Sequence, residues 1–276
     1  MATKIEIYDG ETWWASPDIW IVPGDDPNGT PGQPVAGQTN YVWANVHNNG
    51  TTDINGIRVN FYWSNPATGV LRSTSTLIGS GYVDLREGET KQVLCISPWV
   101  PIVVNGGHEC LVAEALTNLD PLPTPLSDEF DPKRYHQIAQ KNVQVISFSS
   151  SMASMIIPIQ ISATPRKRKS VKISIQKGKL SEKEQIKLFN QLGINPKKYK
   201  EQSNSVLFGL SEKNFTGKDF FGASSIDLKI HEKTSQSLYV HLGQSDKPQS
   251  GFEILLITET IDKKVVGGNT IIILKD

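Results

Sequence analysis

Apolar and polar positions alternate along short segments in the first half of the chain. Within residues 39–47 the aliphatic side chains share one face, namely Val42, Ala44 and Val46. Residues 57–63 repeat this pattern with Ile57, Val59, Phe61 and Trp63. A period of two indicates strands that are buried on one side. Further segments at 77–85, 91–97, 109–116 and 142–148 predict closely spaced strands, as in an antiparallel β-sandwich.

A helical pattern is found in the second half. Ser181 and Glu184 have the spacing of a capping box, in which the serine hydroxyl accepts a hydrogen bond from the Glu184 amide. The apolar residues that follow are Ile186, Leu188, Phe189 and Leu192. Gly193 then provides a common helix stop. The segment therefore predicts a helix near residues 181–192.

On both sides of this helix the period of two returns. It spaces Val171, Ile173 and Ile175, and again Leu238, Val240 and Leu242. The runs 252–261 and 265–274 flank the polar step at 262–264, which predicts a hairpin. The adjacent pair Gly267 and Gly268 predicts a bulge or a turn before the last strand. We expect an all-β chain with two antiparallel, immunoglobulin-like β-sandwich domains in tandem, the second with one inserted α-helix.

The first half resembles a known domain type. Residues 40–50, Asn-Tyr-Val-Trp-Ala-Asn-Val-His-Asn-Asn-Gly, form an alternating segment that ends in an Asn-x-Gly turn, and the aromatic segment 59–63 follows it. Residues 85–90 add an acidic turn that contains Gly-Glu-Thr. Together these motifs resemble CARDB-type bacterial immunoglobulin-like domains over about residues 17–147. The resemblance implies a sandwich fold and a role in adhesion or assembly, and it carries no catalytic residues.

Charge divides the chain into two parts. The 276 residues include 28 basic and 28 acidic side chains, so the formal net charge is zero. Residues 1–148 have a net charge of −8 and contain all 6 Trp, whereas residues 149–276 have a net charge of +8. This contrast predicts an acidic, Trp- and Pro-rich domain at 1–148 and a basic domain at 170–276. Residues 149–169 are expected to form a linker or a shared strand.

Composition also excludes some classes of protein. A hydrophobic content of 38% with 20% charged residues excludes a disordered chain and an integral membrane protein. Apolar runs stay below the roughly 18–20 residues that a membrane span needs. The first residues lack the apolar core of a signal peptide, so we expect a cytoplasmic protein or export without a cleavable signal.

Aromatic residues are dense in the first half. Trp43 and Tyr62 alternate with the aliphatic positions of their strands and should face outward. We predict an exposed binding face made of Trp13, Trp14, Trp43, Tyr62 and Trp99. Such a face suits a protein interface or stacking on a carbohydrate. The alternative is that these rings pack beneath the amino-terminal arm and the loops.

A basic run follows the predicted first domain. It consists of Arg166, Lys167, Arg168 and Lys169. It would contact an acidic partner, serve as a solvated connector, or bind nucleic acid. The last is the least favoured, because no aromatic stacking platform accompanies the charge.

Two further groups of residues could carry chemistry. Asp25, Asp26 and Asn28 supply oxygen ligands for calcium, although the same residue types form ordinary surface turns. Cys95 and Cys110 lie on consecutive predicted strands, and they would be two buried thiols, a disulfide across a hairpin, or a reactive nucleophile. The five His residues lack the spacing of a metal site and are expected at the surface or in hydrogen bonds. We predict no cofactor.

These patterns favour a non-catalytic protein. We predict a structural or adhesion-type bacterial protein that associates with a protein partner, including copies of itself. The domains of charge −8 and +8 would then favour head-to-tail contact. A carbohydrate-binding module that uses the Trp and Tyr residues is the first alternative. A hydrolase or metalloenzyme whose residues converge only in the fold is the second.

Overall fold

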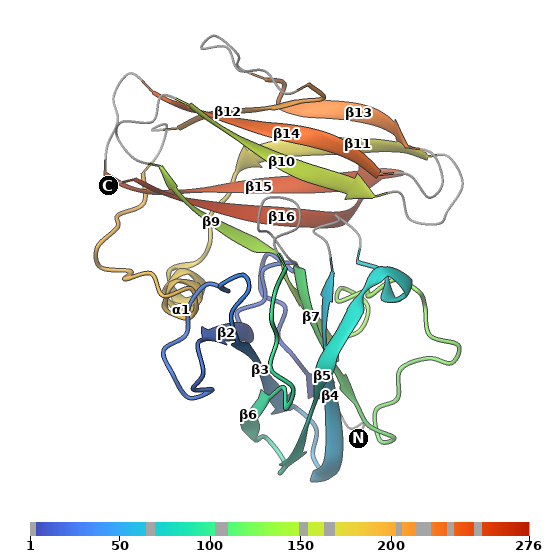
Figure 1. Cartoon of the computed structure of the whole chain (residues 1–276). Coiled ribbons are helices and arrows are strands. Elements are labelled where there is room, and N and C mark those ends of the chain that lie inside the picture. The colour runs from blue at the N-terminus through green and yellow to red at the C-terminus, as the bar shows by residue number, and fades with distance from the viewer. Residues whose placement is uncertain are drawn as a thin grey trace.

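The computed structural model contains two β-sandwiches, and Figure 1 shows the second above the first, with its strands running across the direction of the strands of the first. It describes residues 4–64, 70–102, 110–148, 154–162, 169–202, 206–213, 222–230, 235–245 and 250–275. Within these ranges nearly all regular structure is β. Neighbouring strands pair antiparallel, except for one parallel pair in the second sandwich. The predicted all-β class is confirmed.

The first sandwich packs sheet I against sheet II. Sheet I has β3 (Asn40–Asn48) at its centre, paired with β1 (Ile5–Glu6), β2 (Ile19–Pro23) and β6 (Thr90–Leu94). Sheet II has the order β5 (Thr76–Leu85), β4 (Ile54–Ser64), β7 (Cys110–Leu116) and β8 (Ile138–Lys141). A short 3-10 turn, η1 (Arg72–Thr74), precedes β5. The predicted aliphatic faces of β3 and β4 are buried between the sheets, as their alternation required.

The second sandwich packs sheet III against sheet IV. Sheet III has the order β13 (Ser225–Ile230), β11 (Lys169–Lys177), β15 (Gly251–Ile261), β16 (Lys264–Lys275) and β9 (Val143–Phe148). Sheet IV has the order β10 (Ser154–Ser162), β14 (Ser235–Gln244) and β12 (Val206–Ser211). The predicted hairpin joins β15 to β16, and Asp262 and Lys263 both have positive φ, as a type I′ turn needs. A register shift leaves Val266 unpaired, so a bulge lies next to the predicted Gly267 and Gly268, which themselves pair with Glu259 and Thr258 inside β16.

Helix α1 (Glu182–Gln191) covers the outer face of sheet III. Ser181 caps it by accepting from the Glu184 amide, and Gly193 ends it with φ of +69°. Leu188 and Phe189 are buried against Phe252 and other residues of the sheet. Ile186, which the pattern placed on the buried face, is 42% exposed.

The boundary between the sandwiches lies earlier than the sequence indicated. β9 pairs in parallel with β16, so residues 143–148 belong to the second sandwich and not to a domain that ends at 148. Asn142 alone separates β8 of the first sandwich from β9 of the second. Strand β10 also belongs to the second sandwich, which makes part of the expected linker a core strand. Val143 and Val145 of β9 pack against the hydrophobic cluster beneath α1, which belongs to the second sandwich.

Candidate functional site

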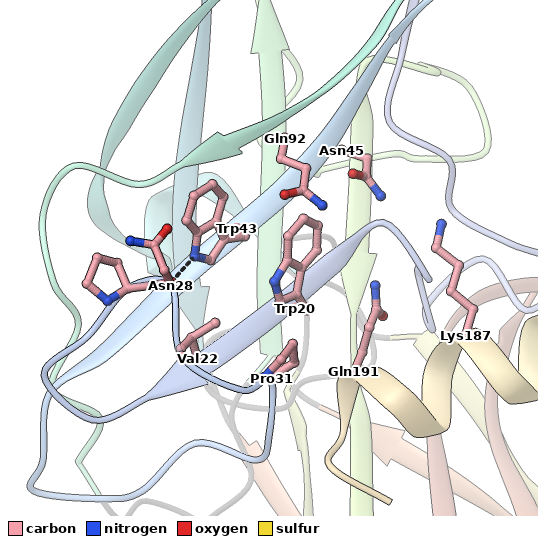
Figure 2. A pocket seen from close by; sticks show the side chains of 11 residues that line it. Trp20, Val22, Asn28, Pro31, Trp43, Asn45, Gln92, Lys187 and Gln191 are labelled. Carbon is pink, nitrogen blue, oxygen red and sulfur yellow. Dashed lines mark hydrogen bonds between the residues drawn. The ribbon is translucent and has the colours of Figure 1, made fainter. Parts of the chain in front are cut away.

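A pocket of about 370 Å³ lies between the outer face of sheet I and α1 (Figure 2). Sheet I provides Trp20, Trp43, Asn45 and Gln92, which come from β2, β3 and β6. Its other walls are Lys187 and Gln191 of α1 and the loop that contains Pro27, Asn28 and Pro31. Both sandwiches therefore contribute to one pocket.

Two stacked indole rings form the apolar part of the pocket. Trp20 and Trp43 are directly paired across β2 and β3, so their side chains stand on the same face of the sheet. Their ring centroids are 5.9 Å apart with an interplanar angle of 6°. Trp43 is fixed further by a hydrogen bond of 3.0 Å from its Nε1 to the carbonyl of Pro27. The aromatic surface is thus held rigidly in place.

Asp18 holds the helix wall of the pocket in position. Its side chain is fully buried, and Lys187 of α1 donates to it at 2.5 Å. His47 Nε2 lies 2.5 Å from the same carboxylate, Asn45 donates to it at 2.9 Å, and the Tyr8 amide donates at 3.0 Å. Burial alone would raise the pKa of Asp18, but the bonds from His47, Lys187 and Asn45 outweigh it and lower this pKa to about 2. The carboxylate therefore stays ionised and links the two sandwiches.

Lys141 forms a second link behind the pocket. Its ammonium donates to the carbonyl of Ile19 at 2.7 Å and to the Gln191 side chain at 3.1 Å. Gln191 in turn donates to the carbonyl of Pro17 at 2.6 Å. Complete burial, together with repulsion from Lys187, lowers the pKa of Lys141 to about 7. The amide of Gln191 is thereby held at the pocket wall.

The predicted aromatic face does not form as one surface. Trp14 and Trp99 are only 5% and 4% exposed. Trp14 lies between the sandwiches, where its Nε1 donates to Thr270 at 3.1 Å, and Trp99 lies in the core of the first sandwich. Their burial corrects the expectation that they bind a partner.

The remaining three aromatic residues lie in different places. Trp43 is on sheet I, whereas Tyr62 is on sheet II and packs against Phe130 with ring centroids 5.0 Å apart. Trp13 lies in a separate cleft beside Lys133. The structure therefore brings only Trp43 of the predicted set into the pocket. The residue that accompanies Trp43 in the pocket is Trp20, another tryptophan of the Trp-rich first half of the chain.

The predicted acidic loop forms a turn that is closed by hydrogen bonds within the loop, and calcium binding by Asp25, Asp26 and Asn28 stays a prediction. Asp26 accepts from the Asn28 amide at 2.9 Å and from Gly29 through its carbonyl, which is an Asx-type turn. Among the described residues no cluster of three His, Cys, Asp or Glu has the arrangement of a metal site. Asp25 lies next to this turn, and its carbonyl accepts from the Tyr41 hydroxyl at 3.4 Å.

The structure describes only the last residue of the predicted basic run. Arg166, Lys167 and Arg168 lie outside the described residues, and Lys169 begins β11. His108 and His231 also lie outside them. The contacts of the run with an acidic partner or nucleic acid stay predictions.

The two cysteines are separate buried thiols. Cys95 follows β6 and packs in the first core, whereas Cys110 begins β7 in the other sheet, and both are free. The strands follow each other in the chain but belong to different sheets, so they form no hairpin. Burial raises the pKa of Cys95 to about 11 and raises that of Cys110 further, which opposes a nucleophilic role. His241, expected at the surface or in hydrogen bonds, is buried with 7% exposure and has a hydrogen bond with the backbone of Lys213.

Several pocket residues carry no sequence signal of their own. Lys187 and Gln191 are ordinary polar residues of an amphipathic helix, and Gln92 is an ordinary polar strand residue. They become neighbours only because α1 of the second sandwich packs against sheet I of the first. The available signal was the alternation that places Trp43 and Asn45 together outside the core.

Comparison with known proteins places the chain in no family. No family profile matches it, and no curated protein sequence matches it. Among solved structures, a candidate carbohydrate-binding protein from Bacteroides ovatus is similar at 12% identity and a TM-score of 0.31, covering 48% of this chain and 35% of that chain. A family 123 glycoside hydrolase from Clostridium perfringens has 11% identity and a TM-score of 0.29, with 49% and 23% covered. The CupB6 tip adhesin from Pseudomonas aeruginosa has 10% identity and a TM-score of 0.25, with 94% and 99% covered.

Similarity at this level carries no argument about function. The chain spans about a third or less of the first two of these proteins. The resemblance to CARDB-type domains stays a prediction. Within the described ranges, the structure contains no helix of sufficient length and apolar character to cross a membrane.

Proposed function

We propose that this chain is a non-catalytic binding protein that holds a carbohydrate in the pocket between sheet I and α1. The observation that carries the proposal is the partly exposed ring of Trp43, which stacks on the buried Trp20 inside a concave site with an amide-rich rim. Binding sites of this kind combine an apolar surface with a few polar groups that fix orientation. The proposal selects the carbohydrate alternative among those that the sequence left open.

The chemistry of the walls matches that of a sugar. The C–H groups on one face of a pyranose carry small positive charge and pack against the electron-rich face of an indole. Sugar hydroxyls both donate and accept, and a primary amide offers the complementary groups. Asn28, Asn45 and Gln92 bring three such amides to the pocket.

Polar groups in the pocket are available to a ligand. Within the described part of the chain, the side chains of Asn28 and Gln92 and the Nε1 of Trp20 make no hydrogen bond. Their solvent hydrogen bonds can be exchanged for bonds to hydroxyl groups at little net cost. Asn45, in contrast, uses its amide nitrogen for Asp18 and keeps its carbonyl oxygen for a ligand.

The lining favours binding over hydrolysis. Glycoside hydrolysis ordinarily uses a pair of carboxylic groups on either side of the scissile bond. The described residues that line the pocket include no Asp or Glu, and Asp18 behind it is committed to Lys187, His47 and Asn45. This lining supports a binding role.

Association between copies is a separate prediction. Within one chain, Asp18 of the acidic sandwich already pairs with Lys187 of the basic one, so part of the charge contrast holds the two sandwiches together. Light scattering across a salt series tests whether further contact occurs between chains. A monomer at every salt concentration would contradict the head-to-tail association.

Calorimetric titration with a panel of neutral mono- and oligosaccharides tests the proposed site. We expect Trp43→Ala to weaken binding about tenfold, because it removes one stacking surface. Gln92→Ala should also weaken binding without affecting stability, since this side chain makes no bond within the described residues.

Tyr82→Ala is the matched control. Tyr82 is an aromatic residue with 64% exposure on sheet II, away from the pocket. It should bind like the wild type. Failure of every saccharide to bind, or equal losses from Tyr82→Ala and Trp43→Ala, would refute the proposal.

A further inference from the structure

A second cleft between the sandwiches gathers four basic side chains. It has a volume of about 720 Å³ and lies between the loop at 129–134 of the first sandwich and the β15–β16 turn of the second. The first side provides Lys133 and Arg134, and the second provides Lys263 and Lys264. Two pairs of cations that are far apart in the sequence therefore meet at one place.

These cations lack partners of opposite charge. In the part of the chain that the structure describes, none of the four forms an ion pair with a carboxylate. Lys133 lies over the Trp13 ring at 5.8 Å and donates weakly to the Val265 carbonyl at 3.5 Å. Arg134 lies over the ring of Tyr135.

Some basic residues elsewhere in the protein have acidic partners. Arg72, Lys187 and Lys91 each pair with an acidic side chain. The lining of the second cleft contains the four cations and two carboxylates, Glu129 and Asp131. Its formal net charge is therefore +2. Asp131 is occupied by its own loop, where it accepts from the Arg134 amide at 3.2 Å. The cleft therefore has a local excess of positive charge beside a domain that is acidic as a whole.

We infer that this cleft binds an anionic saccharide chain, with its carboxylate or sulfate groups between the two basic pairs. Charges on opposite walls can contact successive anionic groups of one chain, and a concave site strengthens their field. A saccharide fits better than single-stranded nucleic acid, which is usually held by a series of stacking rings. Trp13 is the only aromatic residue besides Phe130 that lines the described cleft, and Lys133 lies over it. This site is distinct from the Trp20–Trp43 pocket and does not depend on it.

Binding of dextran sulfate and polygalacturonate, with unmodified dextran as the neutral reference, tests the inference. We expect both polyanions to bind, neutral dextran not to bind at this cleft, and affinity to fall as the salt concentration rises from about 50 to about 300 mM. The variants Lys263→Gln with Lys264→Gln, and Lys133→Gln with Arg134→Gln, should each weaken binding about three- to tenfold.

The matched control removes two charges elsewhere. Lys183 and Lys197 are exposed residues at and after α1, so the double variant Lys183→Gln, Lys197→Gln should retain most of the affinity. Thermal unfolding checks that each variant is folded. Trp43→Ala should retain polyanion binding, which separates this site from the proposed neutral-sugar pocket.

Three results would overturn the inference. The first is an equal loss of affinity in the control and in the cleft variants. The second is the absence of polyanion binding by the folded wild type. The third is tighter binding of single-stranded poly(dT) than of either polysaccharide, which would assign the cleft to nucleic acid instead.

Discussion

The outer faces of the two sheets in the first sandwich are covered in different ways. On sheet II the chain's own loop at 117–135 covers Tyr62, which packs on Phe130. Arg72 lies over the Phe130 ring at 4.1 Å and pairs with the buried Glu114 at 2.5 Å. On sheet I, α1 of the other sandwich forms the cover, and a pocket remains beside Trp43.

This difference separates a region of sheet II whose outer side is filled, over Tyr62 and Glu114, from a region of sheet I that keeps an open pocket. On both faces, aromatic and polar residues occupy alternate positions along a strand. Both faces also contain a buried acidic side chain that is paired with a basic one. On sheet II the loop fills the space over Tyr62 and Glu114. On sheet I a rigid helix, attached through Asp18 and Lys187, stands at a distance and leaves room for a ligand. The function of an outward residue thus depends on what covers it.

The largest expected effect comes from breaking the charged link on sheet I. Asp18→Asn leaves Lys187 without its counter-ion and should lower the free energy of unfolding by about 2–4 kcal/mol, less than for a fully buried pair because Lys187 is 40% exposed. It should also weaken saccharide binding, because Asn45 and Lys187 lose the contacts with Asp18 that position them beside the pocket. Chemical denaturation and calorimetric titration measure the two effects.

The corresponding change on sheet II is Glu114→Gln. It breaks the pair with Arg72 and should destabilise the first sandwich while leaving saccharide binding intact. If both variants lose binding equally, the distinction between the two faces is not valid.

A smaller effect is expected from filling the close contact between the sandwiches. A Cβ at Gly268 would lie 2.5 Å from Cε2 of Trp14, so Gly268→Ala should cost about 1–3 kcal/mol by overpacking. Gly243→Ala is the matched control, because its Cβ would meet Leu207 at an ordinary 3.7 Å. Thermal unfolding of the two variants compares them directly, and equal melting temperatures would contradict the close contact.

The smallest expected effect is a pH dependence that belongs to the sheet I side. Lys141 has its pKa lowered to about 7, so between this value and its ordinary value of 10.5 the unfolded chain binds more protons than the folded one. The free energy of unfolding therefore rises with pH in this window, by about 1 kcal/mol between pH 7 and 8.

The variant Lys141→Met isolates this contribution. Burial and nearby Glu129 raise the pKa of Glu259 to about 8, which acts in the opposite direction between 4.5 and 8. Glu259 is present in both proteins, so its contribution cancels when Lys141→Met is compared with the wild type. The wild type should gain stability relative to the variant as pH rises above 7. Lys91→Met, at an exposed lysine, should show no such trend.

Local patterns were sufficient to predict the strands and the helix. The alternation in β3 and β4 reports which face is buried, and Ser181 with Gly193 marks the ends of α1. These features depend on neighbouring residues in the sequence. They required no knowledge of how the sandwiches meet.

The sites depend on long-range contacts, and therefore the sequence did not reveal them. Trp14 and Trp99 look like exposed rings until the packing of distant segments buries them. Trp20 and Lys187 meet only after two sandwiches dock. The position of β9 was missed for the same reason, since its parallel partner β16 lies at the other end of the sequence.

The parallel pairing of β9 with β16 has a mechanical consequence. β9 enters the second sandwich directly from Asn142, and its residues from Val143 to Phe148 pair with Thr270 to Lys275 of the last strand. Tension applied between Asn142 and Lys275 would pull these two adjacent strands in opposite directions along their length. Such a shear load is shared by all the hydrogen bonds of the pair at once, whereas a peeling load breaks them one by one. The second sandwich is thus built to resist extension between these points.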